Sequence, residues 1–155
     1  MLTYLSGLRA IEVASLKVSD VLDEDGNINS RIMLTKHQTK GQQARPIFVS
    51  DKLKKELRAY LADIKVYNKD QSLFISQKAP FTRHGICMLL KRIYQDAGVI
   101  GASSHSGRRT FATTLNTKSV SVRVIQKLMG HANIGTTQRY IEVSDTQLEN
   151  AVQLI

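Results

Sequence analysis

The sequence predicts an α+β fold that is mostly helical, with helices around a small three-stranded antiparallel sheet. Most of the chain places apolar residues at the three- and four-residue spacing of amphipathic helices. Between residues 28 and 49 the pattern changes to alternation, with a polar, glycine-bearing loop in the middle. No internal repeat, low-complexity tract or linker divides the 155 residues, so we expect one domain long enough to bury a proper core.

The N-terminal segment predicts short helices followed by a strand. Residues 2 to 18 have a largely helical pattern that Ser6 and Gly7 interrupt, so we expect two short helices with a break at Gly7. Residues 23 to 27 form an acidic, glycine-bearing stretch that is typical of a turn. From residue 28 to residue 34 apolar positions alternate with polar or exposed ones, which predicts the first strand.

A polar loop connects this strand to a second one. Residues 45 to 49 predict the second strand, and residues 36 to 43 between the two predict a hairpin loop. Lys40 lies at the tip or flank of that loop. The short apolar run from Leu73 to Ile75 predicts a third strand.

Amphipathic helices make up the rest of the predicted fold. Ser50-Asp51 is typical of the start of a helix, and Thr82 is placed to cap a second helix that ends near Gly98. Further helices are expected at residues 105 to 117, 121 to 129 and 136 to 142, followed by an amphipathic stretch from 145 to 155.

The charge balance favours a polyanionic partner. The chain has 22 Lys and Arg residues against 13 Asp and Glu residues, a formal net charge of +9. Several acids are concentrated between residues 12 and 25, so the remainder is more basic than the average. Lys and Arg that neutralise phosphates release counterions, which makes nucleic acid one candidate partner. Solubility alone is the other interpretation of the charge.

Cysteine content and hydropathy exclude several classes of protein. The single cysteine, Cys87, excludes a disulfide framework and a cysteine-rich metal site. Because it lies in the apolar pattern of Ile86, Leu89, Leu90 and Ile93, we expect a buried structural thiol. No apolar run approaches the roughly 20 residues of a membrane span, and the first residues lack the layout of a signal peptide. We therefore expect a soluble, cytoplasmic protein.

Residues in the last third of the chain are suited to chemistry on a phosphodiester. His105 and Arg108 are three apart at the start of a predicted helix, so both can reach one phosphate, although this spacing also occurs by chance. Gly107 between them allows close backbone approach. His131 follows a glycine helix stop, where capping or packing is the common role. Tyr140 would need a phosphate already neutralised by cations, because a phenol with a pKa of about 10 attacks poorly when protonated.

Five motifs follow one another along the chain: Leu5 to Glu12, Lys40-Gly41 ahead of Arg45 to Ile47, His105 to Arg108, Met129 to His131, and Thr136 to Tyr140. In this order they resemble the catalytic-domain motifs of the tyrosine recombinases, the phage integrase family. The resemblance extends from near residue 2 to about residue 143. It implies the tyrosine recombinase catalytic-domain fold and a site-specific recombinase or integrase that breaks and rejoins DNA.

The resemblance also implies residue roles. Tyr140 is the nucleophile that attacks the scissile phosphate and leaves a 3′-phosphotyrosyl link with a free 5′-hydroxyl. Arg9 and Arg108 clamp the non-bridging oxygens, a role that favours arginine because its planar fork donates two bonds to one phosphate. Together they would stabilise the charge of the transition state.

The remaining roles implied by the resemblance concern proton transfer and support. Lys40 is the general acid that protonates the departing 5′-oxygen, with Lys36 as the nearest competitor. His105 assists proton transfer from Tyr140 and holds the phosphate, and His131 donates a hydrogen bond to a phosphate oxygen. Glu12 supports these residues without reacting. No cofactor or metal is implied, and no carboxylate cluster suited to Mg²⁺ accompanies the set.

The same resemblance implies double-stranded DNA as partner and a homotetramer on DNA, in the cytoplasm of a bacterium or a phage host. The stretch from Asp145 to Ile155 either contacts a neighbouring protomer or packs on its own domain. Residues 1–155 are expected to form the catalytic domain alone. Family members usually have a helical core-binding domain ahead of it, so the chain is expected to be a fragment or a small stand-alone member.

Two departures and three alternatives accompany this interpretation. Ser106-Gly107 replaces the aspartate and leucine common in the third motif, and Arg109 stands where histidine is common. A type IB topoisomerase would share the active-site chemistry and relax DNA without exchanging partners. A truncated module that only binds DNA is the second alternative, and a basic domain with no role on DNA is the third.

Overall fold

Short helices that end at glycines or begin at capping residues build most of this chain. The computed structural model describes residues 1–64, 66, 68–77, 79–141, 143 and 145–153. Its elements in chain order are α1 (Leu2–Ser6), α2 (Ala10–Ser15), α3 (Val18–Val21), β1 (Arg31–Leu34), the 3₁₀ turn η1 (Lys36–Gln38), β2 (Arg45–Phe48), α4 (Asp51–Asp63), α5 (Arg83–Asp96), α6 (Ser106–Thr117), α7 (Val122–Met129), α8 (Ile134–Gln138) and α9 (Asp145–Val152). The predicted α+β, mostly helical class is confirmed.

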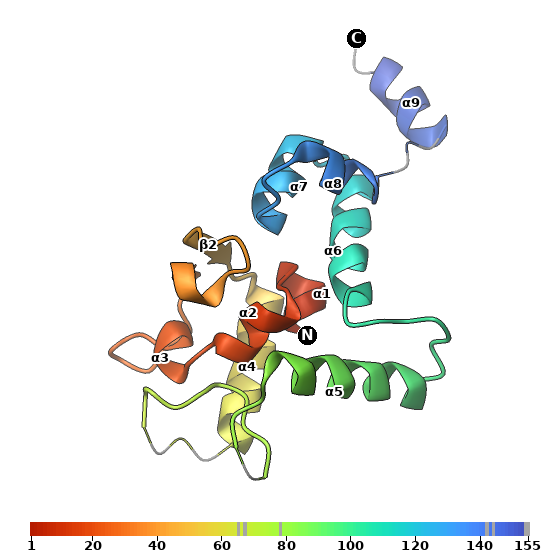
Figure 1. Ribbon diagram of the computed structural model, residues 1–155. Coiled ribbons are helices and arrows are strands. Elements are labelled where there is room, and N and C mark those ends of the chain that lie inside the picture. Colours follow the sequence, from red (N-terminus) through yellow and green to blue (C-terminus); the bar gives the residue numbers. More distant parts are fainter. Residues whose placement is uncertain (65, 67, 78, 142, 144, 154–155) are drawn as a thin grey trace.

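Figure 1 shows two parts joined by α6. Helices α1 to α5 and the hairpin occupy the lower part, α6 rises from them to α7 and α8, and α9 projects away from both. The Gln147 amide of α9 donates to the Asn116 carbonyl of α6 at 2.7 Å and connects the two helices. Within the described residues, no helix is both long and apolar enough to cross a membrane.

Two glycines let α1 and α6 lie close together. Gly7 ends α1 with φ of 65°, as the sequence predicts, and a Cβ added there would lie 2.7 Å from the Phe111 ring of α6. A Cβ added to Gly107 of α6 would lie 2.6 Å from the Thr3 hydroxyl of α1. Each larger side chain would push these helices apart, and α6 holds a residue of the site described below.

The sheet has two strands within the described residues, and the prediction of a third strand at Leu73 to Ile75 is wrong. Strands β1 and β2 pair antiparallel, and the residues that face inward from them are buried. Leu73 is instead buried in the core, and its backbone N–H donates to the carbonyl of Leu16 rather than to a strand. Ile75 forms an isolated bridge with Pro80, so the pairings of this run do not extend into a strand.

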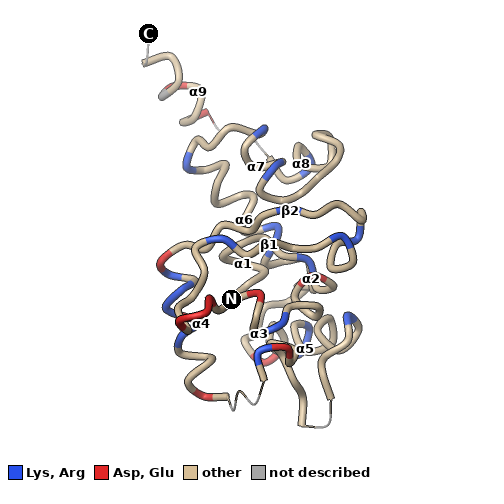
Figure 2. The backbone as a smooth tube through the Cα atoms, turned by 90° about the vertical axis from the view of Figure 1, so that its left-hand side faces the viewer, with Lys and Arg blue, Asp and Glu red and all other residues tan. Residues whose placement is uncertain are grey.

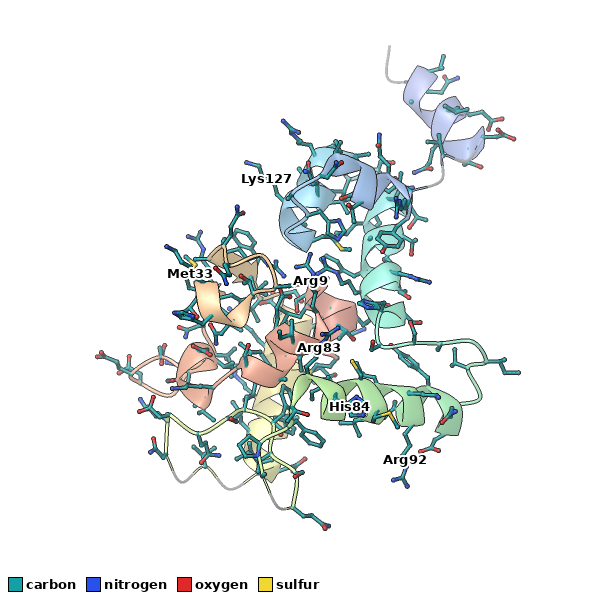
Figure 3. All side chains as sticks on the ribbon, viewed as in Figure 1. Arg9, Met33, Arg83, His84, Arg92 and Lys127 are labelled. Atoms are coloured by element: carbon teal, nitrogen blue, oxygen red, sulfur yellow. The ribbon has the colours of Figure 1, made fainter. Side chains whose placement is uncertain are left out.

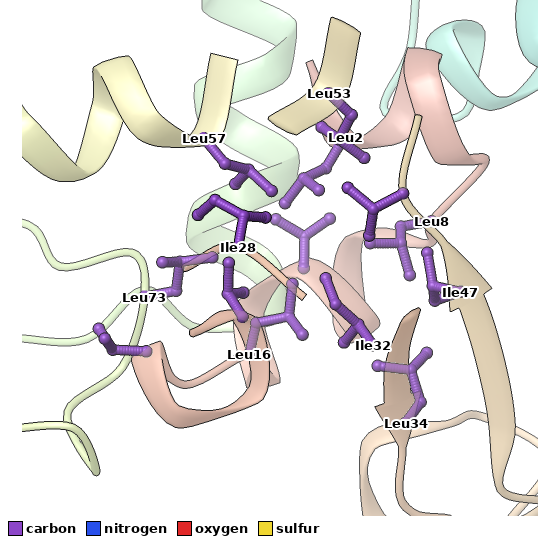
Figure 4. Close-up of a cluster of buried hydrophobic side chains, with 14 of the residues drawn as sticks. Leu2, Leu8, Leu16, Ile28, Ile32, Leu34, Ile47, Leu53, Leu57 and Leu73 are labelled. Carbon is purple, nitrogen blue, oxygen red and sulfur yellow. The ribbon is translucent and has the colours of Figure 1, made fainter. Parts of the chain in front are cut away.

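Apolar side chains gather in two clusters. The larger one fills the space between α1 to α5 and the hairpin (Figure 4); its side chains with essentially no exposure include Leu8, Leu16, Ile32, Leu34, Leu53, Leu57 and Leu73. The smaller one consists of Ala112 in α6 with Ile125 and Met129 in α7. Met129 of the smaller cluster also supplies a backbone carbonyl to the site described below.

Capping residues set the helix boundaries. The Ser50 hydroxyl accepts from the backbone N–H of Leu53 and the Thr82 hydroxyl from that of Gly85, so both predicted caps are confirmed. The helix predicted at residues 136 to 142 begins earlier, at Ile134, because the Asn133 side chain caps it, and ends at Gln138. Residue 142 and residues 154–155 of the predicted last stretch lie outside the described residues.

Helix α5 packs on the core through a narrow face. The prediction that the Cys87 thiol is buried is therefore only partly correct. Ile86 is buried, whereas Cys87 and Leu90 are half-buried against the larger cluster. Leu89 and Ile93, which the sequence pattern placed on the same apolar face, are exposed.

Candidate active site

Three arginines from distant segments converge on the C-terminal end of α7. The last carbonyls of a helix have no partner inside it, and they form the negative end of the helix dipole. Arg45 Nη1, Arg108 Nη2 and Arg9 Nη2 donate to the carbonyl oxygens of residues 128, 129 and 130 at 2.9, 2.6 and 3.1 Å. Arg9 precedes α2, Arg45 begins β2, and Arg108 lies in α6. The end of α7 therefore gathers three positive charges in one place.

The buried carboxylate of Glu12 links two of these arginines. Its side chain is 0% exposed and accepts from Arg9 Nη1 at 3.0 Å and from Arg45 Nη2 at 2.9 Å. The backbone N–H of Arg9 also donates to it at 2.7 Å. A buried carboxylate is tolerated only when it is paired in this way. Glu12 thus fixes Arg9 from both its backbone and its side chain.

Arg108 is the most enclosed of the three guanidiniums. It is 5% exposed, and besides the residue 129 carbonyl it donates to the carbonyl of Gly7. Burial, and then the nearby Arg9, lower the pKa of Arg108 to about 9. Arg108 therefore remains charged at neutral pH.

His131 lies between a donor and an acceptor. Its Nε2 is 2.9 Å from Arg108 Nη2, and its Nδ1 is 2.9 Å from the Thr137 hydroxyl. Because a guanidinium can only donate, Nε2 accepts and the proton resides on Nδ1, which donates to Thr137. Burial, followed by Arg108 and Arg9, lowers the pKa of His131 to about 4, so the imidazole is neutral at pH 7.

Lys40 faces the same place from the hairpin. It lines a cleft of about 410 Å³ together with Arg9, Arg45, Gly130 and His131, among other residues. The hairpin loop is shaped by η1 and by the Thr39 hydroxyl, which accepts from the backbone N–H of Gln43 at 3.1 Å. The geometry therefore brings Lys40 to the rim of the cleft that Arg9 and His131 line.

The Tyr140 ring lies near the His131 ring. The two ring centroids are 6.3 Å apart, and the Arg109 guanidinium lies 5.9 Å from the centre of the Tyr140 ring. Tyr140 is half-buried against the smaller cluster and lines an open groove of about 650 Å³ with Arg109, Arg139 and other residues. Tyr140 therefore lies next to His131, although it lines a different hollow from the cleft that Arg9 and Lys40 line.

His105 lies at the edge of this constellation. It is the exposed residue that precedes α6, and the helix begins one residue later. Burial lowers the pKa of His105 from its ordinary value, and Arg108 and Arg109 lower it further. A neutral imidazole at this place can accept a proton.

The surroundings of the site are basic. Residues 97–141, which supply α6 to α8, contain Lys and Arg but no Asp or Glu. Figure 2 shows the same contrast: acidic residues lie around α2 to α5 and on α9, and the charged residues of α7 are all basic. Figure 3 shows Arg9 in the middle of the molecule, below α7, with Lys127 extending outward from α7. The positive charge of residues 97–141 would attract a polyanion.

Sequence reasoning missed two residues of the site. In the sequence Arg45 is only part of a motif, and its contacts with Glu12 and with Leu128 of α7 join residues that lie 33 and 83 positions away. In the sequence Thr137 is only part of the last motif, whereas the folded chain buries it and its hydroxyl accepts from His131. The polar character of Thr137 within an apolar-facing position was the available signal.

Comparison with known proteins identifies relatives over almost the entire chain. Residues 1–147 match the phage integrase family. Tyrosine recombinase XerC of Treponema denticola is 34% identical over 163 aligned residues, which cover 95% of this chain and 51% of that protein. Tyrosine recombinase XerD of Oceanobacillus iheyensis is 32% identical, covering 98% of this chain and 51% of the relative.

Solved structures of recombinases and an integrase have folds similar to that of this chain. The crystal structure of XerA recombinase superposes with a TM-score of 0.76 at 27% identity and covers 99% of this chain and 55% of that one. XerH site-specific recombinase bound to palindromic difH substrate, in a post-cleavage complex, gives a TM-score of 0.71 at 25% identity and covers 97% of this chain and 42% of that one. The Tn1549 transposon integrase, with circular intermediate DNA, shares the fold with a TM-score of 0.74 at 19% identity, covering 99% and 56%.

The chain spans about half the length of the relatives that it matches. The resemblance drawn from the five motifs is confirmed at the level of the family. With a match over residues 1–147 and relatives above 30% identity along nearly all of its length, this chain belongs to the phage integrase family.

Proposed function

We propose that residues 1–155 form the catalytic domain of a site-specific DNA recombinase that cleaves and rejoins strands through a 3′-phosphotyrosine intermediate. The observation that supports this most directly is the convergence of Arg9, Arg108 and His131 at the end of α7, with the Tyr140 ring 6.3 Å from that of His131. Cations on one side and a tyrosine on the other suit attack on a phosphodiester.

In the proposed cleavage step, the Tyr140 hydroxyl oxygen bonds to the scissile phosphorus while the bond to the 5′-oxygen breaks. The phenolic proton passes to the neutral His105, and Lys40 supplies a proton to the departing oxygen. Rejoining reverses the step, with a 5′-hydroxyl of either duplex as the attacking group. No net oxidation or hydrolysis occurs, so the bond energy is retained in the phosphotyrosine.

Arg9 and Arg108 hold the non-bridging oxygens in this proposal. A guanidinium has five N–H donors, and their bonds to the protein hold the planes in place while other donors remain for phosphate. His131 must change its hydrogen bonds to help, because its Nε2 accepts from Arg108 when DNA is absent. A phosphate oxygen inserted between the two side chains would draw the proton to Nε2.

Double-stranded DNA is the proposed partner, with a homotetramer as the active assembly in the cytoplasm. The solved structures of relatives include recombinase and integrase complexes with DNA, and the acid-free residues 97–141 support the same partner here. Exposed apolar residues near and on α9, Val143, Leu148 and Val152, favour contact with a second protomer over packing on its own domain.

The decisive test uses suicide duplexes, nicked near a randomised half-site so that the cleaved fragment diffuses away. After incubation and denaturation, DNA that remains attached to protein is recovered and sequenced, and the attached residue is identified by peptide mapping. We expect an adduct on Tyr140 that Tyr140→Phe abolishes and that Tyr4→Phe, a change at an exposed tyrosine outside the site, leaves intact.

Each other outcome points to a different conclusion. DNA binding without any adduct would favour a module that only binds. An adduct that persists in Tyr140→Phe would refute the nucleophile. Relaxation of supercoiled DNA without exchange between two duplexes would favour a topoisomerase.

A further inference from the structure

We propose that Arg45 is a positioning residue of this active site: it orients Arg9 through Glu12 and fixes the end of α7 beside His131, without binding the phosphate. The inference rests on the proposed function and deepens it. Arg45 has no role in the mechanism outlined above, yet its contacts reach both halves of the site.

The first observation is the burial of Arg45. Its side chain is only 12% exposed, and a buried guanidinium is costly unless its donors are paired. Arg45 Nη2 and Nε donate to the two carboxylate oxygens of Glu12 at 2.9 and 3.4 Å, and Nη1 donates to the Leu128 carbonyl at 2.9 Å. The planar group therefore spans an anion on α2 and the end of α7.

The second observation is the fit between Arg45 and Gly130. Gly130 ends α7 with φ of 62°, and a Cβ added there would lie 2.6 Å from Arg45 Cδ and 2.7 Å from Nε. Only a glycine lets the side chain of Arg45 lie against the helix end. His131 is the next residue, so the position of Arg45 and the direction in which the chain leaves α7 are coupled.

The third observation is that Glu12 also accepts hydrogen bonds from Arg9. The carboxylate oxygens that accept from Arg45 also accept from Arg9 Nη1 and from the Arg9 backbone. Arg45 thereby sets the rotation of the carboxylate that Arg9 follows. A lysine would keep the charge but has no planar fork to reach Glu12 and Leu128 together.

The experiment compares single-turnover cleavage by wild type, Arg45→Met, Arg45→Lys and Arg92→Met at saturating DNA, on a half-site recovered as above. Arg92→Met is the matched control: it removes one positive charge from an exposed arginine that points away from the molecule in Figure 3. Each variant is also assayed on a substrate whose 5′-bridging oxygen is replaced by sulfur, which leaves as a thiolate and needs no general acid.

We expect Arg45→Met to slow cleavage by about 100-fold, the scale of a misplaced catalytic group, on both the oxygen and the sulfur substrate. Lys40→Met, added as a reference variant, should cleave the sulfur substrate at a rate near that of wild type, since it lacks only the general acid. Arg45→Lys should slow cleavage less than Arg45→Met does. DNA affinity should fall equally in Arg45→Met and Arg92→Met, because each variant loses one charge.

Three results would overturn the proposal. Rescue of Arg45→Met by sulfur would place Arg45 on the leaving-group side with Lys40. A DNA affinity far below that of Arg92→Met would make Arg45 a phosphate ligand. A cleavage rate equal to that of Arg92→Met would leave Arg45 without a positioning role.

Two further measurements separate folding and the proposed function from this inference. If Arg45→Met melts early, the double variant Glu12→Gln with Arg45→Met removes the buried charge that has lost one of its two arginines, and it should fold and still cleave slowly. If wild type forms no adduct, the proposed function fails, and the inference is judged from guanidinium NMR signals of Arg9. These should be sharp in wild type and Arg92→Met and exchange-broadened in Arg45→Met; unchanged signals would refute the positioning role.

Discussion

Replacing Gly130 by alanine tests how tightly the end of α7 is packed. Gly130 has φ of 62°, a left-handed conformation that costs an L-residue about 1–2 kcal/mol. The new methyl group would also lie 2.6 Å from Arg45 Cδ. Arg45 cannot simply move aside, because Glu12 and the Leu128 carbonyl hold its far end. Losing one charge-assisted hydrogen bond adds about 1.5–3 kcal/mol, so we expect Gly130→Ala to cost about 2.5–5 kcal/mol.

Gly98→Ala is the matched control for this substitution. Gly98 follows α5 with φ of 72°, and a Cβ added there meets nothing within 4 Å. It should therefore cost only the conformational part, about 1–2 kcal/mol. Urea denaturation of both variants at the same pH measures the two free energies of unfolding, and equal m-values show that the unfolded state is unchanged.

A second substitution locates the cause of the extra cost. In an Arg45→Ala background, Gly130→Ala should cost about as much as Gly98→Ala, because the side chain that the methyl group meets has gone. The reasoning fails if Gly130→Ala and Gly98→Ala destabilise the wild-type chain equally. It also fails if Gly130→Ala costs the same with and without Arg45.

Three further predictions concern the polar groups of the site. The pKa of His131 lies at about 4 in the folded protein, below the ordinary 6.5, so the unfolded chain binds more protons between these values; stability should fall as pH drops from 6.5 towards 4, and urea melts of His131→Gln should show a shallower fall. Thr137→Val should destabilise by about 1–3 kcal/mol in thermal and urea melts, because it leaves the His131 Nδ1–H unpaired; Thr136→Val, at the exposed neighbouring position, should not. Glu12→Gln should cost about 3–5 kcal/mol by the same melts, since it leaves two guanidiniums without their carboxylate, whereas Glu56→Gln on the exposed side of α4 should leave stability unchanged.

Local patterns predicted several elements well. The hairpin could be predicted because alternation and a glycine-bearing loop are both local signals. In the structure β1 and β2 pair on either side of that loop. The caps at Ser50 and Thr82 could be predicted because each side chain accepts a hydrogen bond from the backbone N–H only three residues further along the chain. The run at Leu73 to Ile75 misled, because an apolar triplet does not say whether the core will receive it as a strand or as a single buried leucine.

For the candidate site, too, some features could be predicted from local patterns and others could not. The order and spacing of the motifs within the sequence determined the family, and they indicated Arg9, Lys40, His105, Arg108, His131 and Tyr140 as candidates, because each motif is a short local pattern. Only the tertiary structure decided that Arg9, Arg45 and Arg108 bind three successive carbonyls at the end of α7 and that Glu12 joins two of these arginines. These contacts join residues far apart in the chain, and a buried charge acquires its partners only when distant elements pack together.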